Sequence, residues 1–301
     1  MLIGFDIGGT KIEICVLDKS GNTLFKHRTP TPHEYELFLS TLCQLVAMAE
    51  SETQTHCQIG IGLPGAISPA TGLIKNANCT FLNGRDLKAD LCARLQRNVV
   101  IANDANCFAL SEVVDGAAKD GNVVFGAILG TGCGGGIVIN KQVLVGANAV
   151  CGEWGHNPLP SFTSERDGPT RHCYCGRDNC IELFISGSGL TKSAQLIGQQ
   201  EWNAAEIITR YQQQDPQATK LYQQLIDQMA RSFACIVNVL DPDVIVLGGG
   251  LSNVASLYVD LPRATANYVF SDSAQIVFTQ AKYGDSSGIR GAAWLGLTSR
   301  K

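Results

Sequence analysis

The 301-residue sequence lacks the long apolar runs and the excess of one charge that mark several classes of protein. No run approaches the ~18 apolar residues that cross a bilayer. The first six residues have no basic segment and are interrupted by an acid, so we expect no signal peptide. The formal net charge of −4 provides no basic field for nucleic acid or an anionic membrane. We therefore predict a cytoplasmic protein with a small-molecule ligand, no nucleic-acid partner and no membrane partner.

Three common nucleotide-binding patterns are also absent or out of place. The sequence contains no G-x-x-x-x-G-K-[ST] P-loop, and none of the H-R-D or D-F-G triplets of protein kinases. Gly130, Gly132 and Gly135 fit G-x-G-x-x-G, but that fingerprint opens a helix and here the strand-like residues 137–139 follow. These glycines therefore need another explanation.

Two glycine-rich turns each follow an apolar run and lead into another strand-like run. They are D-I-G-G-T-K at 6–11 and G-T-G-C-G-G-G at 130–136. Glycine lets backbone N–H groups approach an anion closely, so the turns predict two phosphate-binding hairpins that hold one nucleotide. Ordinary hairpins, whose glycines only satisfy backbone angles, are the alternative. A third cluster at 248–250 lies between a strand and a helix and is a further place for the nucleotide.

The chain is longer than one hydrophobic core usually organises, so two domains with a cleft between them are expected. Apolar strands alternate with helical patterns, and the strand, glycine turn, strand order of the N-terminus restarts near residue 123, which indicates an α/β protein. We place the N-terminal domain at 1–118, with a C-terminal helix at 286–301 packing back on it, and the second domain at 119–285.

Four carboxylates and one amide are candidates for chemistry. Asp6 ends a strand beside the first glycine turn, where it would hold Mg²⁺ directly or through water, or else cap the turn. Asn103 and Asp104 end the strand 99–102 and precede a helix, so Asp104 is either a base that orients an accepting hydroxyl or a helix N-cap. Glu153 and Glu182 lie in tight segments and suit the hydroxyls of a polyol.

Twelve cysteines in a long chain without an expected export signal are predicted to be mostly reduced thiols. Cys173, Cys175 and Cys180 are clustered, and with His156 they would form a Cys₃His zinc site, because Zn²⁺ binds thiolate and imidazole. Unrelated thiols are the alternative, and His172 is the rival imidazole.

With these motifs, the chain resembles the family of bacterial repressors, open reading frames and kinases, called ROK, over essentially its whole length. The motifs are D-I-G-G-T-K at 6–11, N-D-A-N at 103–106, G-T-G-x-G-G-G at 130–136, G-E-W-G-H at 152–156 and C-Y-C-G-x-x-x-C-I-E at 173–182. The resemblance implies the two-domain actin-like ATPase (ribonuclease H-like) fold with an interdomain cleft.

The resemblance also implies roles for single residues, with Asp104 as the catalytic base. ATP with Mg²⁺ would be bound by Asp6, Gly8, Gly9, Thr10, Lys11, Gly130, Thr131, Gly132, Gly134, Gly248, Gly249 and Gly250. The sugar would contact Gly65, Asn78, Asn103, Asp104, Glu153, His156 and Glu182. Structural Zn²⁺ would be held by His156, Cys173, Cys175 and Cys180. The family commonly has glycine just before the third cysteine, where Asn179 follows Asp178 here, and we expect this difference to loosen the loop slightly.

Residues 75–78, 82–84, 155–160 and 284–288 look most like the manno(fructo)kinase branch of the family. The predicted reaction is therefore transfer of the γ-phosphoryl group of ATP to the C6 hydroxyl of fructose, with mannose and glucose as further acceptors. An N-acetylglucosamine kinase is the alternative, because it shares most of the framework. Repressors of the family carry an N-terminal winged-helix segment, which we do not expect in a chain that opens on its first strand. For the oligomeric state, a homodimer is one option that the sequence allows.

Overall fold

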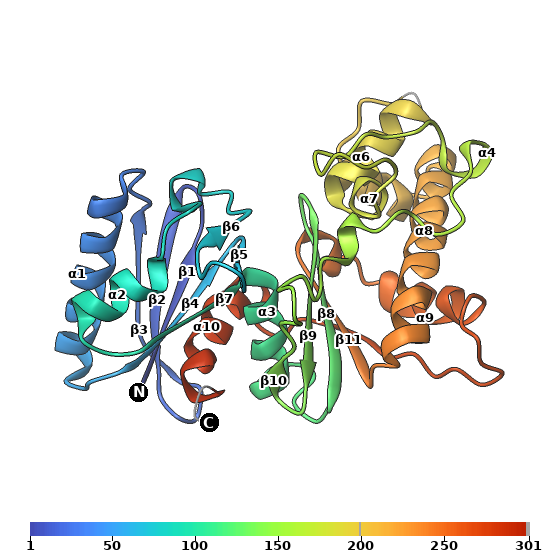
Figure 1. The fold of residues 1–301 in the computed structure, drawn as a ribbon. Coiled ribbons are helices and arrows are strands. Elements are labelled where there is room, and N and C mark those ends of the chain that lie inside the picture. Colours follow the sequence, from blue (N-terminus) through green and yellow to red (C-terminus); the bar gives the residue numbers. More distant parts are fainter. Residues whose placement is uncertain (199, 299–301) are drawn as a thin grey trace. The chain divides into compact units, whose positions relative to one another are not determined.

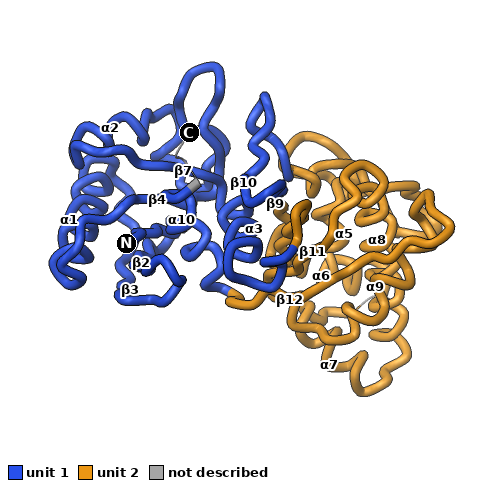
Figure 2. The backbone as a smooth tube through the Cα atoms, turned by 90° about the horizontal axis from the view of Figure 1, so that it is seen from below, with its two compact units in different colours: residues 1–120, 136–152, 285–301 blue, residues 121–135, 153–284 orange. Residues whose placement is uncertain are grey.

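The computed structural model describes residues 1–198 and 200–298. The chain forms two compact units (Figure 2). Unit 1 contains residues 1–120, 136–152 and the C-terminal segment from Asp285, and unit 2 contains residues 121–135 and 153–284. The limits 1–118 and 119–285 stay a prediction, and the last three residues of the predicted helix 286–301 lie outside the described residues.

Unit 1 is built on a five-stranded sheet of order β3-β2-β1-β4-β7 (Figure 1). Strand β1 pairs antiparallel with β2 and parallel with β4, and β4 pairs parallel with β7. The carboxyl ends of the three parallel strands therefore meet at one edge. The strands are β1 Leu2–Ile7, β2 Lys11–Leu17, β3 Thr23–Pro30, β4 Gln58–Leu63 and β7 Val99–Asn103.

Helices cover both faces of this sheet (Figure 1). Phe5 of β1 belongs to the same core cluster as Phe38 of α1 (Tyr35–Thr53). Successive strand residues point to opposite faces, so Gly4 faces the other side, where α10 (Ser287–Thr298) lies. A Cβ on Gly4 or Gly60 would overlap backbone atoms of α10, so glycine at these positions lets the helix pack directly on the sheet.

The second sheet has the order β10-β9-β8-β11-β12, and the division between the units passes through β9. Strand β11 pairs parallel with both β8 and β12. The strands are β8 Val123–Leu129, β9 Cys133–Ile139, β10 Gln142–Val143, β11 Val244–Gly248 and β12 Phe278–Gln280. In unit 2, helix α8 (Pro216–Leu240) begins at Pro216, and its N-cap Asp215 accepts the N–H groups of Gln217 and Ala218.

The remaining described elements are short. The strands are β5 Ala66–Ile67 and β6 Ile74–Lys75. The helices are α2 Leu87–Leu95, α3 Asp104–Val114, α4 Ser164–Asp167, α5 Glu182–Ile185, α6 Gly187–Leu196, α7 Ala204–Gln212 and α9 Leu257–Ala266. Single 3₁₀ turns span Thr80–Leu82, Trp154–His156, Gly250–Asn253 and Gly284–Ser286.

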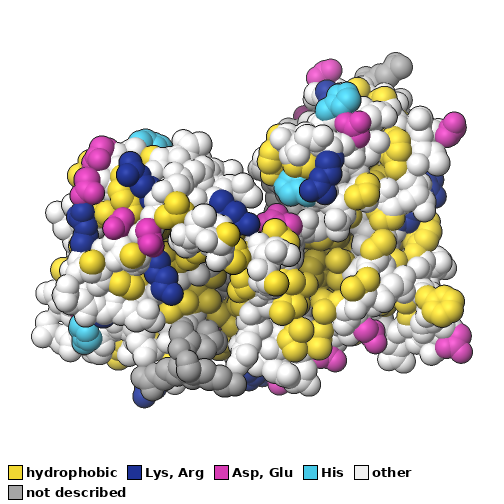
Figure 3. Space-filling model, viewed as in Figure 1, with side chains coloured by type: hydrophobic (Ala, Val, Ile, Leu, Met, Phe, Trp, Pro, Cys, Tyr) yellow, Lys and Arg dark blue, Asp and Glu magenta, His cyan; other side chains and the backbone are white. Residues whose placement is uncertain are grey.

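The surface and the helices also bear on the predicted partners. Among the described residues, no helix combines the length and apolar character needed to cross a membrane. On the face drawn in Figure 3, basic and acidic side chains lie interspersed, without a broad area of one sign.

Candidate functional site

The first glycine turn is anchored on one side and open on the other. The Gly8 N–H donates to the Lys11 carbonyl at 2.9 Å, and the Thr31 hydroxyl donates to the Gly8 carbonyl at 2.7 Å. Gly9, Thr10 and Lys11 are exposed, and nothing lies within 4 Å of the place where a Gly9 Cβ would be. The turn therefore presents accessible backbone, as an anion-binding hairpin requires.

Asp6 and Asp104 lie at the edge where the parallel strands of unit 1 end. The pKa of Asp6 is raised from 3.8 to about 6, chiefly by burial and then by the charges of Asp104 and Glu13, against a smaller lowering by Lys11. Burial also raises the pKa of Asp104 above its ordinary value. Two poorly hydrated carboxyl groups that repel one another favour a bound cation or a proton, as at many sites of proton or phosphoryl transfer.

Asn103, rather than Asp104, occupies the N-cap position of α3. Its Oδ1 accepts the Ala105 N–H at 2.9 Å, and its Nδ2 donates to the Gly65 carbonyl at 3.2 Å. Asp104 Oδ1 shares the Ala105 N–H at 2.8 Å. A Cβ on Gly65 would lie 2.9 Å from the Ala77 Cα, beside exposed Asn78. Unit 1 thus brings together the predicted sugar residues Gly65, Asn78 and Asn103.

In unit 2, the other two glycine clusters lie against each other. Gly249 has a positive φ of 77°, and a Cβ there would lie 2.7 Å from the Gly130 nitrogen. The Gly187 N–H at the start of α6 donates to the Gly130 carbonyl at 2.7 Å. The β8–β9 turn, the end of β11 and the start of α6 therefore meet, and they bring Gly130–Gly132 close to Gly248–Gly250.

The second turn is shorter than the predicted segment 130–136, because β9 already begins at Cys133. Its last glycine allows close packing rather than a turn, since a Cβ on Gly136 would overlap the Ala105 carbonyl. Gly134 also lies in the strand, where its carbonyl accepts the Trp154 indole N–H at 3.0 Å.

Glu182 and Glu153 are presented by anchored segments of unit 2. The Cys133 N–H donates to Glu182 Oε2 at 2.9 Å, which fixes this carboxylate beside the second glycine turn. Exposed Glu153 precedes the 3₁₀ turn Trp154–His156. Buried Trp154 packs with its ring centroid 5.2 Å from that of Phe125, so the turn that carries Glu153 is attached to the core.

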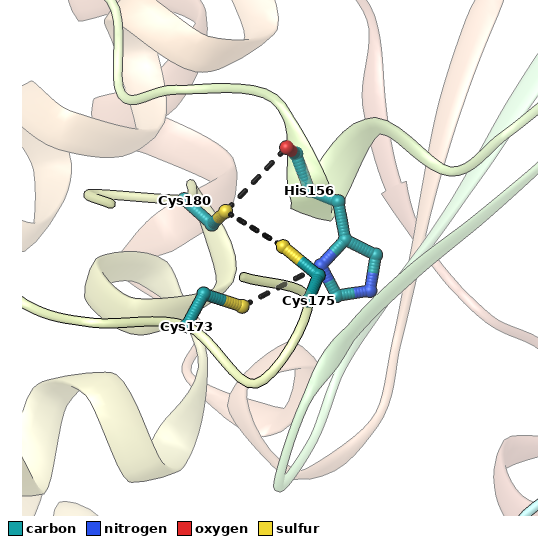
Figure 4. Close-up of side chains that lie close together, drawn as sticks. All are labelled: His156, Cys173, Cys175 and Cys180. Atoms are coloured by element: carbon teal, nitrogen blue, oxygen red, sulfur yellow. Dashed lines mark hydrogen bonds between the residues drawn. The ribbon is translucent and has the colours of Figure 1, made fainter. Parts of the chain in front are cut away.

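The four side chains predicted to bind zinc lie close together in the structure (Figure 4). The ligand atoms of His156, Cys173, Cys175 and Cys180 all lie within 4.8 Å of one another. Cys175 Sγ is 3.5 Å from Cys180 Sγ, and Cys173 Sγ is 3.7 Å from His156 Nδ1. Zinc–sulfur bonds of about 2.3 Å in a tetrahedron separate the sulfurs by about 3.8 Å, so the cluster fits the ion. His172, the alternative imidazole ligand, is engaged elsewhere, because its Nδ1 lies 2.6 Å from Asp178 Oδ1.

Asn179 keeps the loop closed where the family commonly has glycine. It has a positive φ of 55°, a conformation that asparagine tolerates better than most residues. Its N–H donates to the Arg171 carbonyl at 2.8 Å, and its Oδ1 accepts the Arg171 N–H at 2.9 Å. The side chain therefore adds a bond that glycine cannot make, and these contacts give no sign of the expected loosening.

Sequence reasoning missed Tyr174, although it stands between two candidate zinc ligands. Its hydroxyl lies 3.0 Å from His156 Nε2, and its ring meets the imidazole edge-on with centroids 5.2 Å apart. Partial desolvation and, after it, the negative charges of Glu182, Cys173 and Glu153 together raise the pKa of the Tyr174 phenol to about 12. The C-Y-C spacing was the available signal.

Comparison with known proteins agrees with this fold and these motifs. The ROK family model matches residues 2–299. The N-acetyl-D-glucosamine kinases of Salmonella gallinarum and Shigella boydii are each 40% identical over 302 residues, covering 99% of this chain and 100% of the relative. The ROK hexokinase of Thermus thermophilus matches with a TM-score of 0.85 and 30% identity, over 99% of both chains.

A ROK family glucokinase from Streptomyces griseus, in complex with glucose and AMPPNP, matches with a TM-score of 0.73 and 27% identity over 99% of both chains. The two-sheet α/β architecture is therefore the actin-like ATPase fold, as predicted. The chain belongs to the ROK family, and its resemblance to the sugar kinases of that family is confirmed.

Proposed function

We propose that the protein transfers the γ-phosphoryl group of ATP to the C6 hydroxyl of N-acetyl-D-glucosamine. The observation that carries this proposal is the 40% identity to N-acetyl-D-glucosamine kinases across 99% of the chain. Fructose, the acceptor predicted from short segments, has no such support and becomes the competitor to be tested.

The glycine turns and Asp6 are assigned to the nucleotide. The three glycine clusters expose backbone at Gly9, Thr10, Thr131 and Gly250, which suits phosphate oxygens. Asp6, buried at the end of β1, would hold Mg²⁺ directly or through water, because Mg²⁺ prefers oxygen ligands and keeps several waters. Bound there, Mg²⁺ would neutralise charge on the transferring phosphates.

Asp104 is assigned as the group that aligns the C6 hydroxyl and accepts its proton. A carboxylate of ordinary pKa near ~4 is a weak base towards an alcohol. Burial raises the pKa of Asp104, which makes the carboxylate a better acceptor. In a loose transition state the hydroxyl becomes acidic only as the new bond forms, so alignment by Asp104 is the larger part of its role.

The remaining sugar contacts are assigned to both amide and carboxylate side chains. Asn103 Nδ2 donates to the Gly65 carbonyl from the start of α3, and the carboxylates of Glu182 and Glu153 can accept hydrogen bonds from sugar hydroxyls. Zinc held by all four ligands would have no open position, so its role would be to fix the loop that presents Glu182 and His156.

A coupled ADP-release assay with N-acetylglucosamine, fructose, mannose and glucose tests the proposal. Selectivity is a difference in transition-state binding, so kcat/KM is the quantity to compare. We expect the highest kcat/KM with N-acetylglucosamine, and mass spectrometry of the product should find one phosphate on that sugar. A kcat/KM for fructose tenfold above that for N-acetylglucosamine would contradict the proposal and restore the manno(fructo)kinase prediction.

A further inference from the structure

Arg171 is a buried arginine of unit 2 whose guanidinium binds backbone instead of a carboxylate. Its side chain is 6% exposed, and the described part of the chain has no carboxylate within ion-pair distance of it. Arg231, buried in the same unit, instead pairs with Asp167 at 2.6 Å. Burying a cation without a counter-charge is costly, so stability alone does not explain why an arginine stands at position 171.

The guanidinium of Arg171 holds the turn between α5 and α6, which we call the α5–α6 corner (residues 182–189). Nη1 donates to the Leu183 carbonyl and, at 3.1 Å, to the Gly189 carbonyl, and Nη2 donates to Ser193 Oγ at 2.9 Å. The last carbonyls of a helix lack partners within it, and Arg171 supplies one for Leu183 near the end of α5. A Cβ on Gly189 would lie 2.8 Å from the Leu183 carbonyl, so the two helices are in direct backbone contact here.

The α5–α6 corner contacts the parts of unit 2 that are assigned to the two substrates. Glu182, the carboxylate assigned to the hexose, is its first residue and accepts a backbone N–H of the second glycine turn at 2.9 Å. Gly187, at the start of α6, donates its N–H to the Gly130 carbonyl at 2.7 Å, in the turn assigned to the nucleotide. A shift of the corner would therefore move both groups together.

We propose that Arg171 is a positioning residue, which holds the α5–α6 corner in one conformation and so sets Glu182 for the hexose and the Gly130 turn for the nucleotide. Arg171 acts on these groups through the corner, because its own side-chain donors end on Leu183, Gly189 and Ser193. The inference rests on the proposed function, which assigns the two groups to the two substrates.

The physical consequence is a coupling between the two ligands once Arg171 is removed. Without its hydrogen bonds, the ligand that binds first must order the corner and loses affinity, whereas the second ligand binds a corner that is already ordered. Each ligand alone should therefore bind more weakly, and each should strengthen the binding of the other. A residue that only stabilises the fold would lower the melting temperature without creating this coupling.

Arg171→Met tests the inference, because methionine fills part of the buried space and has no donor. Arg171→Lys is a second variant, which keeps the cation but lacks the planar fork that serves several acceptors. Arg231→Lys is the matched control, since Arg231 is also buried in unit 2 and binds Asp167 and Asp227 instead of the corner.

Isothermal titration calorimetry measures the Kd of AMPPNP with Mg²⁺, in the absence and in the presence of saturating N-acetylglucosamine. The converse titration measures the Kd of the sugar with and without AMPPNP. The ratio of the two Kd values for one ligand is the coupling factor, and it must be the same in either order of addition. Zinc content and melting temperature are measured for each variant.

For Arg171→Met we expect the Kd of each ligand alone to rise about tenfold, as for a corner that is ordered about one-tenth of the time. The coupling factor should rise above its wild-type value by about the same amount. Zinc content should stay unchanged, because the bonds of Asn179 to position 171 go to the backbone. Arg171→Lys should show the same changes at smaller size, and Arg231→Lys should keep the wild-type coupling factor.

Unchanged affinities, a loss for one ligand alone, an unchanged coupling factor or a loss of zinc in the Arg171 variants would overturn the inference. A raised coupling factor in Arg231→Lys would also overturn it, because the effect would then not belong to the corner. If Arg171→Met does not fold, Arg171→Lys decides by the same criteria.

The two proposals fail in different ways. If the wild-type protein prefers fructose, the proposed acceptor is wrong, and the Arg171 variants are then titrated with fructose as the hexose. If the wild-type protein prefers N-acetylglucosamine and the Arg171 variants keep the wild-type coupling factor, only the role of Arg171 is rejected.

Discussion

Replacing Asp6 by asparagine removes a buried charge and keeps the side-chain size. The pKa of Asp6 is raised from 3.8 to about 6, chiefly by burial. A folded-state pKa above the unfolded value gives stability that is present at low pH and lost as pH rises through the folded pKa. The ionised carboxylate therefore costs about 3 kcal/mol at pH 7.5 and about half of that at pH 5. Asp6→Asn should stabilise the fold by up to these amounts.

Urea unfolding at pH 7.5 and pH 5, followed by tryptophan fluorescence in buffer free of Mg²⁺ and nucleotide, measures both values. Asp243→Asn is the control of opposite sign, because N–H groups of Val123 and Asn122 lower the pKa of Asp243, and the variant should gain no stability. Asp6→Asn should also lose phosphoryl transfer if Asp6 holds Mg²⁺. A variant less stable than wild type at pH 7.5, or a gain that does not shrink at pH 5, would refute the reasoning.

Three further substitutions test other parts of the structure. Cys175→Ser should reduce zinc from about one per chain and lower melting temperature and activity together, and a zinc-free wild-type protein of normal stability would contradict the site. Asn103→Ala should lower the free energy of unfolding by about 1 kcal/mol through loss of the α3 cap, and an unchanged urea midpoint would argue against that cap. Asn179→Ala should lower the free energy of unfolding by about 1–2 kcal/mol, because alanine is strained at the positive φ of this residue, and Asn179→Gly should lower it less. Equal losses for the two variants would show that the backbone conformation is not the cause.

The N-terminal hairpin could be predicted from the sequence. The strand-like runs before and after the first glycine turn are the observed β1 and β2. Ile12, Ile14 and Val16 alternate, and the glycine turn between the two runs marks where the chain reverses. The pattern is informative here because it is local.

Glycines that serve packing could not be separated from glycines that serve turns. The run at 130–136 was predicted to be one turn, but Gly136 lies in β9 against the backbone of Ala105. Its partner is distant in the sequence, and no local pattern reports such an approach. The short helix α4 was likewise not predicted, and its buried Asp167 pairs with Arg231 of α8 at 2.6 Å.

The candidate zinc cluster was predicted from residue types and the family motif, and the structure assembles those four residues. The acceptor sugar was harder, because most of the framework is shared between kinases of different hexoses. Short segments pointed to fructose, whereas the full-length relatives are N-acetyl-D-glucosamine kinases. Few side chains decide such selectivity, and short segments of sequence do not show which of them reach the acceptor.

The kcat of Asp104→Asn, measured by ADP release with N-acetylglucosamine, tests the account most directly. Asparagine keeps the size of the side chain but removes the charge and the proton acceptor. Asn103 already caps α3, so the fold should tolerate the change. We expect kcat to fall at least ~10²-fold, with melting temperature and ATP affinity close to wild type. A variant that melts early and keeps a near-normal kcat would show that Asp104 supports the helix and does not take part in phosphoryl transfer.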